Sequence, residues 1–523
     1  MFVGQSGAAS RGKSPVFDEP PHIASGLSYV ATHTFNANPQ HPPLLKEMSA
    51  ISLGLAGIHW PDTPLARQVI AGGPEGANME WPVGNEIIAS NGSDRVMFWA
   101  RLPFILLGGG LGAVIYLFGR ALFGAAAGLG ALLIYALDPT FVAHSFLVTT
   151  DVGVTAFTTL FLFLLWRYLE RASWPRLVCC GLALGGAMGA KFSAILLLPV
   201  AAVLIVARMR SITRSLIAFA SISVIALGVV EALYFFPRDP TLYLAGFGRV
   251  NADHLQGQLA FFNGQLAPHF YSYFVAAYLL KEPLASIALA AGGLALVWTR
   301  TSIPRHTKLF LLLPPAFFVL AITFMADDLG VRYILPALPF AYLLGGLALA
   351  TLWSHGSRWA RPAAGALCVW LVMAAAGIYP DHLSYFNEAA CLADAPGRIG
   401  FDGGSRCGPL WLDDSNVDWG QGVKQLRTWM DQHAPGRTVR LAYFGTFPPK
   451  EYGLKYELLD PESLISRPPP GLYAVSAFWI GRIPAAVEAV APGAAFWMRE
   501  IAPAAVVGHA FYIYDIRPRA NDE

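Results

Sequence analysis

The sequence is poor in charge, in cysteine and in metal-binding patterns. Only 13% of its 523 residues are charged, against roughly 25% in water-soluble domains. The 5 cysteines form no CxxC pair and no Cys/His cluster with zinc spacing, which excludes a disulfide scaffold and a structural zinc site. Because 36 basic and 34 acidic residues nearly cancel to +2, no nucleic-acid partner is expected.

Apolar residues dominate instead, at 55% of the chain, with a mean hydropathy of +0.48. This composition predicts a membrane protein. The stretch 177–206 carries Lys191 in its middle, so we expect two short spans that meet there, because a charge at mid-membrane is costly. Together with these two, apolar runs that approach the length of a membrane helix predict about ten spans, the others lying near 99–118, 122–137, 152–168, 215–236, 284–298, 308–325, 333–353 and 362–379.

Basic residues fall in alternate loops between these runs, and acids collect in the opposite loops. The positive-inside rule assigns the basic loops to the cytoplasm. Residues 1–98 and everything after 380 then lie outside. The basic loops carry Arg120, then Arg167, Arg171 and Arg176, then Arg208, Arg210 and Arg214, then Arg300, Arg305 and Lys308, and finally Arg358 and Arg361.

The expected fold is a polytopic α-helical membrane protein with a C-terminal extracytoplasmic α/β domain. Residues 1–98 form a first outer loop with interfacial helices, 99–379 the transmembrane domain, and 380–523 the outer domain. In the last, a helix over about 419–433 and alternating apolar residues at 438–445, 471–480 and 510–516 predict a small sheet. Because 1–98 begins outside with no spanning run or signal-peptide core, we expect a leading span to be missing.

An acid pair opens the first outer loop, in the segment PVFDEPPHIASGLSYV. Asp18 and Glu19 directly precede Pro20 and Pro21, and proline is favoured in the first turn of a helix. Both acids therefore lie at the start of a helix that runs to about Thr34. They either cap this helix or act chemically at its N-terminus.

Two further outer segments hold polar residues. In NPQHPPLLKEM, His41 and Lys46 flank a proline pair, and Lys46 either meets an anionic head group or snorkels at the interface. In LDPTFVAHSFLVTTDVG, His144 and Asp151 precede a span, where helix capping by Asp151 is an equal alternative.

Cations also lie at the outer ends of apolar segments. Lys191, Lys281 and Arg332 could together hold a phosphate group, although each alone is more often an interfacial anchor or an ion-pair partner. His269 lies beside the aromatic stretch FYSYF in the 237–283 outer loop, where aromatic residues are typical of an interfacial belt.

The outer domain contributes two smaller features. Asp418 and Gln421 have the spacing of a helix N-cap and its third residue, which favours capping over catalysis for Asp418. Cys391 and Cys407 are the only cysteines outside the predicted spans. They form either a disulfide or two free thiols.

The order of these motifs resembles a known family. The DE pair, the HPP…K segment, DP…AH…TTD, the KF turn, LKEP, RYILPALP, YFNE and SNVDWGQ follow one another over about residues 17–430. This order is similar to that of the polyprenyl-phosphate-dependent glycosyltransferases of family 39, relatives of protein mannosyltransferases and aminoarabinose transferases with the GT-C fold.

The resemblance implies an enzyme of the plasma membrane that moves a sugar from a polyprenyl-phosphate carrier to an acceptor hydroxyl on the extracytoplasmic face. Asp18 matches the general base, Glu19 its partner and Asp151 the acid of the second loop. Lys46 matches a basic residue near the donor phosphate. The acceptor is a protein, a lipid or a glycan, and membrane lipids surround the enzyme. A divalent metal could help to neutralise the phosphate.

Two other classes of protein compete with this interpretation. A transporter also contains broken spans and intramembrane charge, but its ionisable residues usually lie near the bilayer midplane and its halves repeat. Here the candidates gather at one face and no repeat is visible. The other alternative is a non-catalytic membrane scaffold whose outer domain binds a partner.

Overall fold

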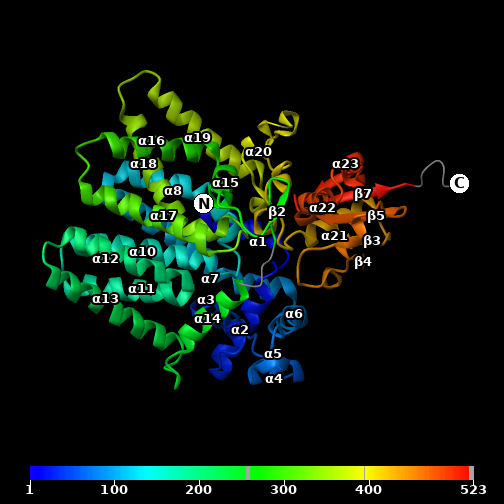
Figure 1. Ribbon diagram of the computed structural model, residues 1–523, viewed down its shortest axis with the longest axis horizontal. Coiled ribbons are helices and arrows are strands. Elements are labelled where there is room, and N and C mark those ends of the chain that lie inside the picture. Colours follow the sequence, from blue (N-terminus) through cyan, green and yellow to red (C-terminus); the bar gives the residue numbers. More distant parts are fainter. Residues whose placement is uncertain (255–258, 394, 518–523) are drawn as a thin grey trace.

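The computed structural model of the chain describes residues 1–254, 259–393 and 395–517. A large helical body carries a small sheet-containing part at one end (Figure 1). The body consists of α7 Ser93–Phe123, α8 Ala125–Ala136, α9 Pro139–His144, α10 Asp151–Glu170, α11 Trp174–Ala190, α12 Leu197–Arg208, α13 Ile212–Leu233, α14 Leu242–His254, α15 Tyr273–Lys281, α16 Leu284–Thr299, α17 Arg305–Met325, α18 Leu338–Ser354 and α19 Ala360–Gly377.

Every predicted span lies on a helix of this body, and the chain is a multi-pass membrane protein. Among the described residues, six helices are long and apolar enough to cross a membrane, and α15 with α16, bent by 113°, would make a seventh. The remaining predicted spans are shorter. Helix α8, for example, has 12 residues, and at 1.5 Å per residue it is well short of the roughly 30 Å hydrocarbon core.

The predicted break at Lys191 is confirmed. Helix α11 ends at Ala190, Lys191 has an extended backbone, and a 3₁₀ turn over Phe192–Leu196 leads into α12. The side chain of Lys191 can therefore leave the helical stack at the end of the body that faces the sheet.

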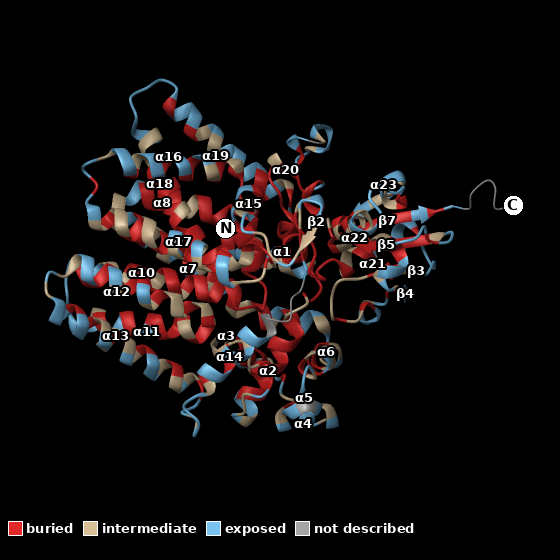
Figure 2. Cartoon of the chain, in the orientation of Figure 1, coloured by how far each residue is buried: buried red, intermediate tan, exposed pale blue. Residues whose placement is uncertain are grey.

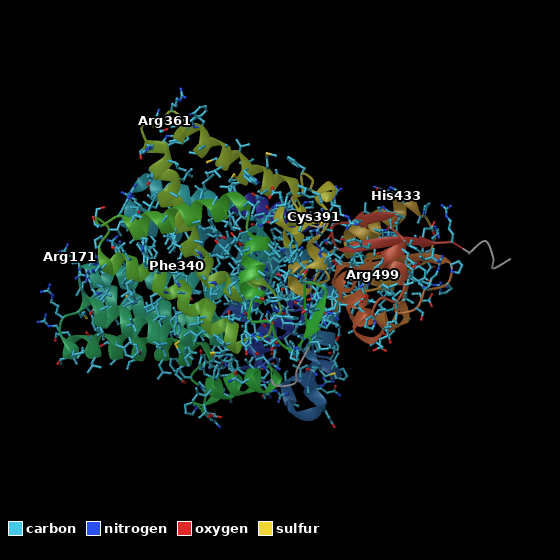
Figure 3. The ribbon with its side chains drawn as sticks, turned by 45° about the horizontal axis from the view of Figure 1, so that its top comes forward. Arg171, Phe340, Arg361, Cys391, His433 and Arg499 are labelled. Atoms are coloured by element: carbon cyan, nitrogen blue, oxygen red, sulfur yellow. A yellow bond between two sulfur atoms is a disulfide. The ribbon has the colours of Figure 1, made fainter. Side chains whose placement is uncertain are left out.

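The arginine-rich loops lie at the other end. Figure 3 shows Arg171 and Arg361 far from Cys391 and His433. Glu170 joins three of these loops, because it contacts Arg208 at 3.5 Å and His306 at 3.3 Å. The charge asymmetry read from the sequence is thus an asymmetry between the two ends of the molecule.

The first outer region forms short helices that pack on the body. They are α1 Phe2–Arg11, α2 Glu19–Thr32, α3 Leu44–Leu55, α4 Pro64–Ala71, α5 Gly73–Gly76 and α6 Glu80–Ser90. Helix α2 ends two residues before the predicted Thr34. Its backbone lies against α3 and α6. A Cβ at Gly26 of α2 would overlap the Lys46 carbonyl of α3, and a Cβ at Gly84 of α6 would overlap the Pro20 carbonyl of α2.

The C-terminal part is a five-stranded mixed sheet in the order β4-β3-β5-β7-β6. Strand β3 is parallel to β4 and β5, whereas β7 is antiparallel to β5 and β6. Figure 2 shows buried residues both in this sheet and where it meets the body. The elements are β3 Val439–Ala442, β4 Tyr456–Leu458, β5 Gly471–Ser476, β6 Ala505–Val507, β7 Phe511–Ile516, α20 Ala389–Leu392, α21 Val423–His433, α22 Ala477–Val490 and α23 Trp497–Glu500.

The predicted strands appear as β3, β5 and β7, although β3 ends at Ala442, three residues before the predicted end. Residues 477–480 were expected to extend a strand but begin α22, because the hydroxyl of Ser476 accepts a hydrogen bond from the Phe478 N–H at 3.2 Å and caps this helix. The short strands β4 and β6, and a hairpin of β1 Ala260–Phe262 with β2 Gln265–Ala267, were not predicted.

Candidate active site

Asp18 lies at the start of α2 but does not cap it. Its side chain makes no hydrogen bond to the helix N–H groups, although Pro20 and Pro21 occupy the first turn as expected. Instead a carboxylate oxygen accepts a hydrogen bond from Arg332 Nη1 at 3.2 Å. The capping interpretation is therefore wrong for Asp18, whose side chain projects toward a basic residue far along the chain.

Glu19 is fully buried, and both of its carboxylate oxygens accept hydrogen bonds. Arg101 of α7 binds it in a bidentate ion pair, at 2.8 Å from Nε to Oε1 and 2.6 Å from Nη2 to Oε2. The N–H groups of Val16 and Val148 donate to the same carboxylate at 2.9 and 3.0 Å. Glu19 thus fixes the start of α2 to the body and to the second outer loop.

Asp151 is the first residue of α10 and pairs with the lysine at the helix break. Its Oδ1 lies 2.7 Å from Lys191 Nζ, and the N-cap position of α10 is occupied by Thr150. The ammonium also lies 4.6 Å above the centre of the Tyr333 ring. Two segments forty residues apart in sequence therefore place an acid and a base side by side.

Arg332 is the central cation of a cluster that it forms with Asp18, Asp151 and Lys191, since both cations contact the Tyr333 ring. It belongs to a 3₁₀ turn, Val331–Ala337, that precedes α18. Its guanidinium contacts Asp18, lies 4.0 Å from Asp414 and stacks 4.2 Å above the Trp419 ring. Within the described part of the chain, its Nε has no hydrogen-bond partner, so one edge of the guanidinium is not committed.

His22 belongs to the site and was missed in the sequence. It follows Asp18 by one helical turn, which is the one signal that could have found it. Its Nδ1 lies 2.8 Å from the Val148 carbonyl, and its ring meets that of His41 edge-on at 5.2 Å. Burial, with Lys46 nearby, lowers the pKa of His22 to about 4, and burial holds the pKa of His41 well below its usual value. Both imidazoles are neutral at pH 7.

Lys46 and Lys281 do not fit the predicted phosphate-binding role. The buried Lys46 ammonium donates to the carbonyls of Asn38 at 2.6 Å and His41 at 2.9 Å. Lys281 donates to the carbonyls of Leu383 at 2.7 Å and Asn416 at 2.6 Å. Their positive charges satisfy backbone oxygens, which excludes interfacial snorkelling for Lys46 and leaves neither ammonium facing a ligand.

The two other histidine candidates differ in position. His144 is buried at the end of α9, and burial lowers its pKa to about 3, with Asp151, Arg332 and Lys191 close enough to influence it. His269 instead lies 3.2 Å from Asp328 and packs edge-on against Tyr271. His144 therefore adjoins the cluster, whereas His269 contacts a different loop.

The SNVDWGQ motif joins the body to the sheet. Asp418 accepts hydrogen bonds from the Gly420 N–H at 2.9 Å and from the Ser476 hydroxyl, and burial raises its pKa to about 7. The predicted capping role is wrong, because α21 begins at Val423 with Gly422 as its N-cap, four residues later than expected. The neighbouring Trp419 supplies the ring that stacks on Arg332.

An amphipathic cavity of about 300 Å³ adjoins the cluster. His41, Lys191, Ser193 and Tyr333 are among its polar lining residues, while its apolar lining includes Ile195, Leu196, Ile322 and Met325. A ligand with a charged head and a hydrocarbon tail fits such a lining. Within the described ranges, no group of three or more His, Cys, Asp or Glu residues is arranged to hold a metal ion.

One part of the chain matches a known protein family. Residues 90–235, from the end of α6 to just past α13, match the family described as dolichyl-phosphate-mannose-protein mannosyltransferase. This match confirms the predicted family resemblance for that part of the chain. No curated protein matches the sequence.

Several solved structures are similar at low identity. ArnT from Cupriavidus metallidurans in the apo state is 14% identical, with a TM-score of 0.49 over 98% of this chain and 97% of that chain. ArnT bound to undecaprenyl phosphate gives a TM-score of 0.46 at 14% identity, covering 98% of this chain and 96% of that chain. The archaeal oligosaccharyltransferase AglB from Archaeoglobus fulgidus, with an inhibitory peptide and a dolichol-phosphate, gives 0.45 at 12% identity over 87% of this chain and 63% of that chain.

Proposed function

We propose that the chain is a membrane glycosyltransferase that moves a sugar from a polyprenyl-phosphate carrier to an acceptor hydroxyl. One observation carries this proposal: the Asp18–Arg332 and Asp151–Lys191 ion pairs lie together, because both cations contact the Tyr333 ring, beside a cavity with polar and apolar lining. The Asp18 carboxylate can take a proton, and Arg332 and Lys191 can bind a phosphate. The apolar lining of the cavity can hold the start of a prenyl chain.

The reaction needs few groups. The acceptor oxygen forms a bond to the anomeric carbon, and the bond from that carbon to the phosphate oxygen breaks. Asp18 takes the acceptor proton, and the bonding electrons leave on the polyprenyl phosphate, whose charge Arg332 and Lys191 neutralise. Asp151 orients Lys191 at 2.7 Å, and Glu19 acts as a positioning residue through Arg101.

The residues present do not form a ready site for a divalent cation. Asp18 and Asp151 each face a basic side chain, and Asp414 lies 4.0 Å from Arg332. The positive charge that a metal would bring to the phosphate is already supplied by Lys191 and Arg332. We therefore derive no step through a metal.

We further propose that the site faces the extracytoplasmic side of the plasma membrane. The arginine-rich loops at the opposite end support this orientation. So does the Cys391–Cys407 disulfide in the part that carries the sheet, since disulfides persist in oxidising compartments. We also propose that residues 1–98 form the first outer loop, 99–379 the membrane domain and 380–523 the outer domain.

A transfer assay tests the function. Purified protein is mixed with polyprenyl-phosphate sugars, and the release of polyprenyl phosphate is measured with membrane extracts as acceptor. A glycosyltransferase releases the carrier and labels an acceptor. A transporter or a scaffold binds at most and releases nothing, and that result with every donor would overturn the proposal.

A further inference from the structure

A second cavity, of about 620 Å³, adjoins the amphipathic cavity and has no role in the mechanism above. It is formed where α2 and the loops around it meet α14, in the lower part of Figure 1. Its volume lies inside the roughly 300–1,000 Å³ of small-molecule sites. We call it the neutral pocket, and its lining includes Tyr29, Phe35, His41, Glu80, Tyr234 and Arg249.

The lining combines aromatic rings with polar side chains. Phe35 packs against Tyr29 at 4.7 Å and against Tyr234 at 4.8 Å, which gives an apolar wall of three rings. Amide, carboxylate and guanidinium groups occupy the rest of the lining. A sugar ring presents C–H groups on its faces and hydroxyls around its edge, so it matches aromatic surface and mixed donors and acceptors together.

The lining of the neutral pocket includes one acid, Glu80, and one permanent cation, Arg249. Burial raises the pKa of Glu80, and the nearby charges of Lys46 and Arg249 oppose that shift. His41 is held neutral by burial. A ligand with several phosphates or carboxylates would meet no excess positive charge here, in contrast to the side of the cluster with Lys191 and Arg332.

The neutral pocket also touches the amphipathic cavity. Gln40 and His41 line both of them, and Lys191 lines only the amphipathic side. The wall between the two spaces is therefore shared. Lys46 holds that wall in place, because its ammonium binds the His41 carbonyl at 2.9 Å.

We propose that the neutral pocket binds the acceptor and that the acceptor is a neutral, hydroxyl-rich glycan. This inference rests on the proposed glycosyl transfer, with the donor phosphate on the Lys191 side of His41 and the acceptor on the other side. An anionic glycan would lack the match in charge, and a peptide backbone presents no sugar ring face to the aromatic wall.

Ala245→Phe tests the inference, because Ala245 lines the neutral pocket and is exposed, so a larger ring fills the pocket without disturbing the core. Ala252→Phe is the matched control: it is an exposed alanine on the same helix that lines neither cavity. Glu80→Gln is a second variant that keeps the shape of the side chain.

The probes are neutral oligosaccharides, sialylated oligosaccharides and a Ser/Thr peptide, and binding is measured by saturation-transfer NMR in detergent. We expect neutral oligosaccharides to bind, Ala245→Phe to weaken them about tenfold or more, Glu80→Gln to weaken them several-fold, and Ala252→Phe to change nothing. Preference for the sialylated probe or the peptide, or equal binding by Ala245→Phe, would overturn the inference.

Transfer from a polyprenyl-phosphate sugar is measured in the same samples. If neutral oligosaccharides bind in the pocket but no donor is ever consumed, the glycosyltransferase proposal fails while the glycan site stands. If donor is consumed but only the peptide is labelled, the transferase proposal stands and the neutral-glycan inference fails.

Discussion

Single residues decide which charges at the outer end can act on a ligand. Four cations were candidates for the donor phosphate, and two of them, Lys46 and Lys281, are committed to backbone carbonyls. Lys191 and Arg332 face carboxylates instead. An ion pair at a cavity wall can be rearranged by an incoming phosphate, whereas a buried ammonium that leaves its carbonyls would strand them unsatisfied.

Asp18→Asn tests the general base. The substitution keeps the shape of the side chain, and no capping bond is lost because Asp18 makes none. We expect the transfer rate to fall by about 10²–10⁴, with unchanged expression and thermal unfolding. The control is Asp62→Asn, an exposed acid of the same outer region that pairs with Arg67. A rate within a few-fold of wild type for Asp18→Asn would reject the assignment.

Lys46→Met tests the structural role of a lysine once assigned to the donor. Loss of the ammonium leaves the His41 carbonyl without this donor and the Asn38 carbonyl with the Tyr29 hydroxyl at 3.2 Å, and an unsatisfied buried group costs about 1–3 kcal/mol. The expected result is a lower midpoint in thermal unfolding with little change in the KM for the donor. A large rise in that KM with unaltered unfolding would restore the phosphate-binding role.

At the scale of elements, the site is built where secondary structure begins or breaks. Asp18 precedes α2, Asp151 opens α10, Lys191 separates α11 from α12, and Arg332 lies in the turn before α18. Polar side chains at such ends leave the apolar stack without interrupting a span. The outer ends of several helices therefore supply the chemistry, while their middles supply the packing.

The Cys391–Cys407 bridge is an element-scale prediction about the segment that follows α19. It closes a loop with a sequence separation of 16, worth roughly 3 kcal/mol in the chain-entropy model. Alkylation of denatured protein without reductant should label Cys179, Cys180 and Cys368 only, as read by mass spectrometry. Labelling of Cys391 and Cys407 in the same sample would show that the bridge does not form.

At the scale of the whole molecule, the first outer region and the C-terminal part are interlocked. The Phe17 N–H donates to the Trp419 carbonyl at 2.8 Å, and Ser14 Oγ donates to the Gly420 carbonyl at 2.8 Å. Lys13 pairs with Asp381 beyond α19. The segment that carries Asp18 is thus held from both the membrane body and the sheet.

The same junction makes stability depend on pH. His509 lies 2.9 Å from Asp381 and 3.0 Å from Asp402, and its hydrogen bonds to these carboxylates outweigh burial and raise its pKa to about 9. Because the folded pKa exceeds the unfolded value of about 6.5, the stabilisation is full below pH 6.5 and is lost as pH rises through 9.

Thermal unfolding from pH 6 to pH 10 measures this contribution, which we expect to be about 3 kcal/mol. His509→Gln should flatten the alkaline decline. The exposed His433 on α21 provides the control, because His433→Gln should leave the profile of the wild type intact. An unchanged decline in His509→Gln would assign the pH dependence to other groups.

Orientation in the membrane is a second prediction at this scale. Single cysteines at Asp62, Gln432 and Arg171, all exposed, are introduced after the free cysteines have been replaced by alanine. Those at Asp62 and Gln432 should react with a membrane-impermeant thiol reagent in intact cells, and that at Arg171 only after lysis. The reverse pattern would invert the proposed topology.

The sequence by itself determined the helical segments, the break at Lys191, the opposition of charges between the two ends and the position of Asp18 and Glu19 at a helix start. Each of these depends on local properties: the length of an apolar run, the cost of a buried charge, or the preference of proline for a first helical turn. Local signals also located three of the five strands in the main sheet.

Only the tertiary structure decided the partners of the charged residues. Glu19 pairs with Arg101, Asp18 with Arg332, and Lys281 with carbonyls of the outer part, and all these contacts join segments far apart in sequence. Whether a charge is free depends on desolvation and on what surrounds it in three dimensions, and no pattern of neighbouring residues encodes that.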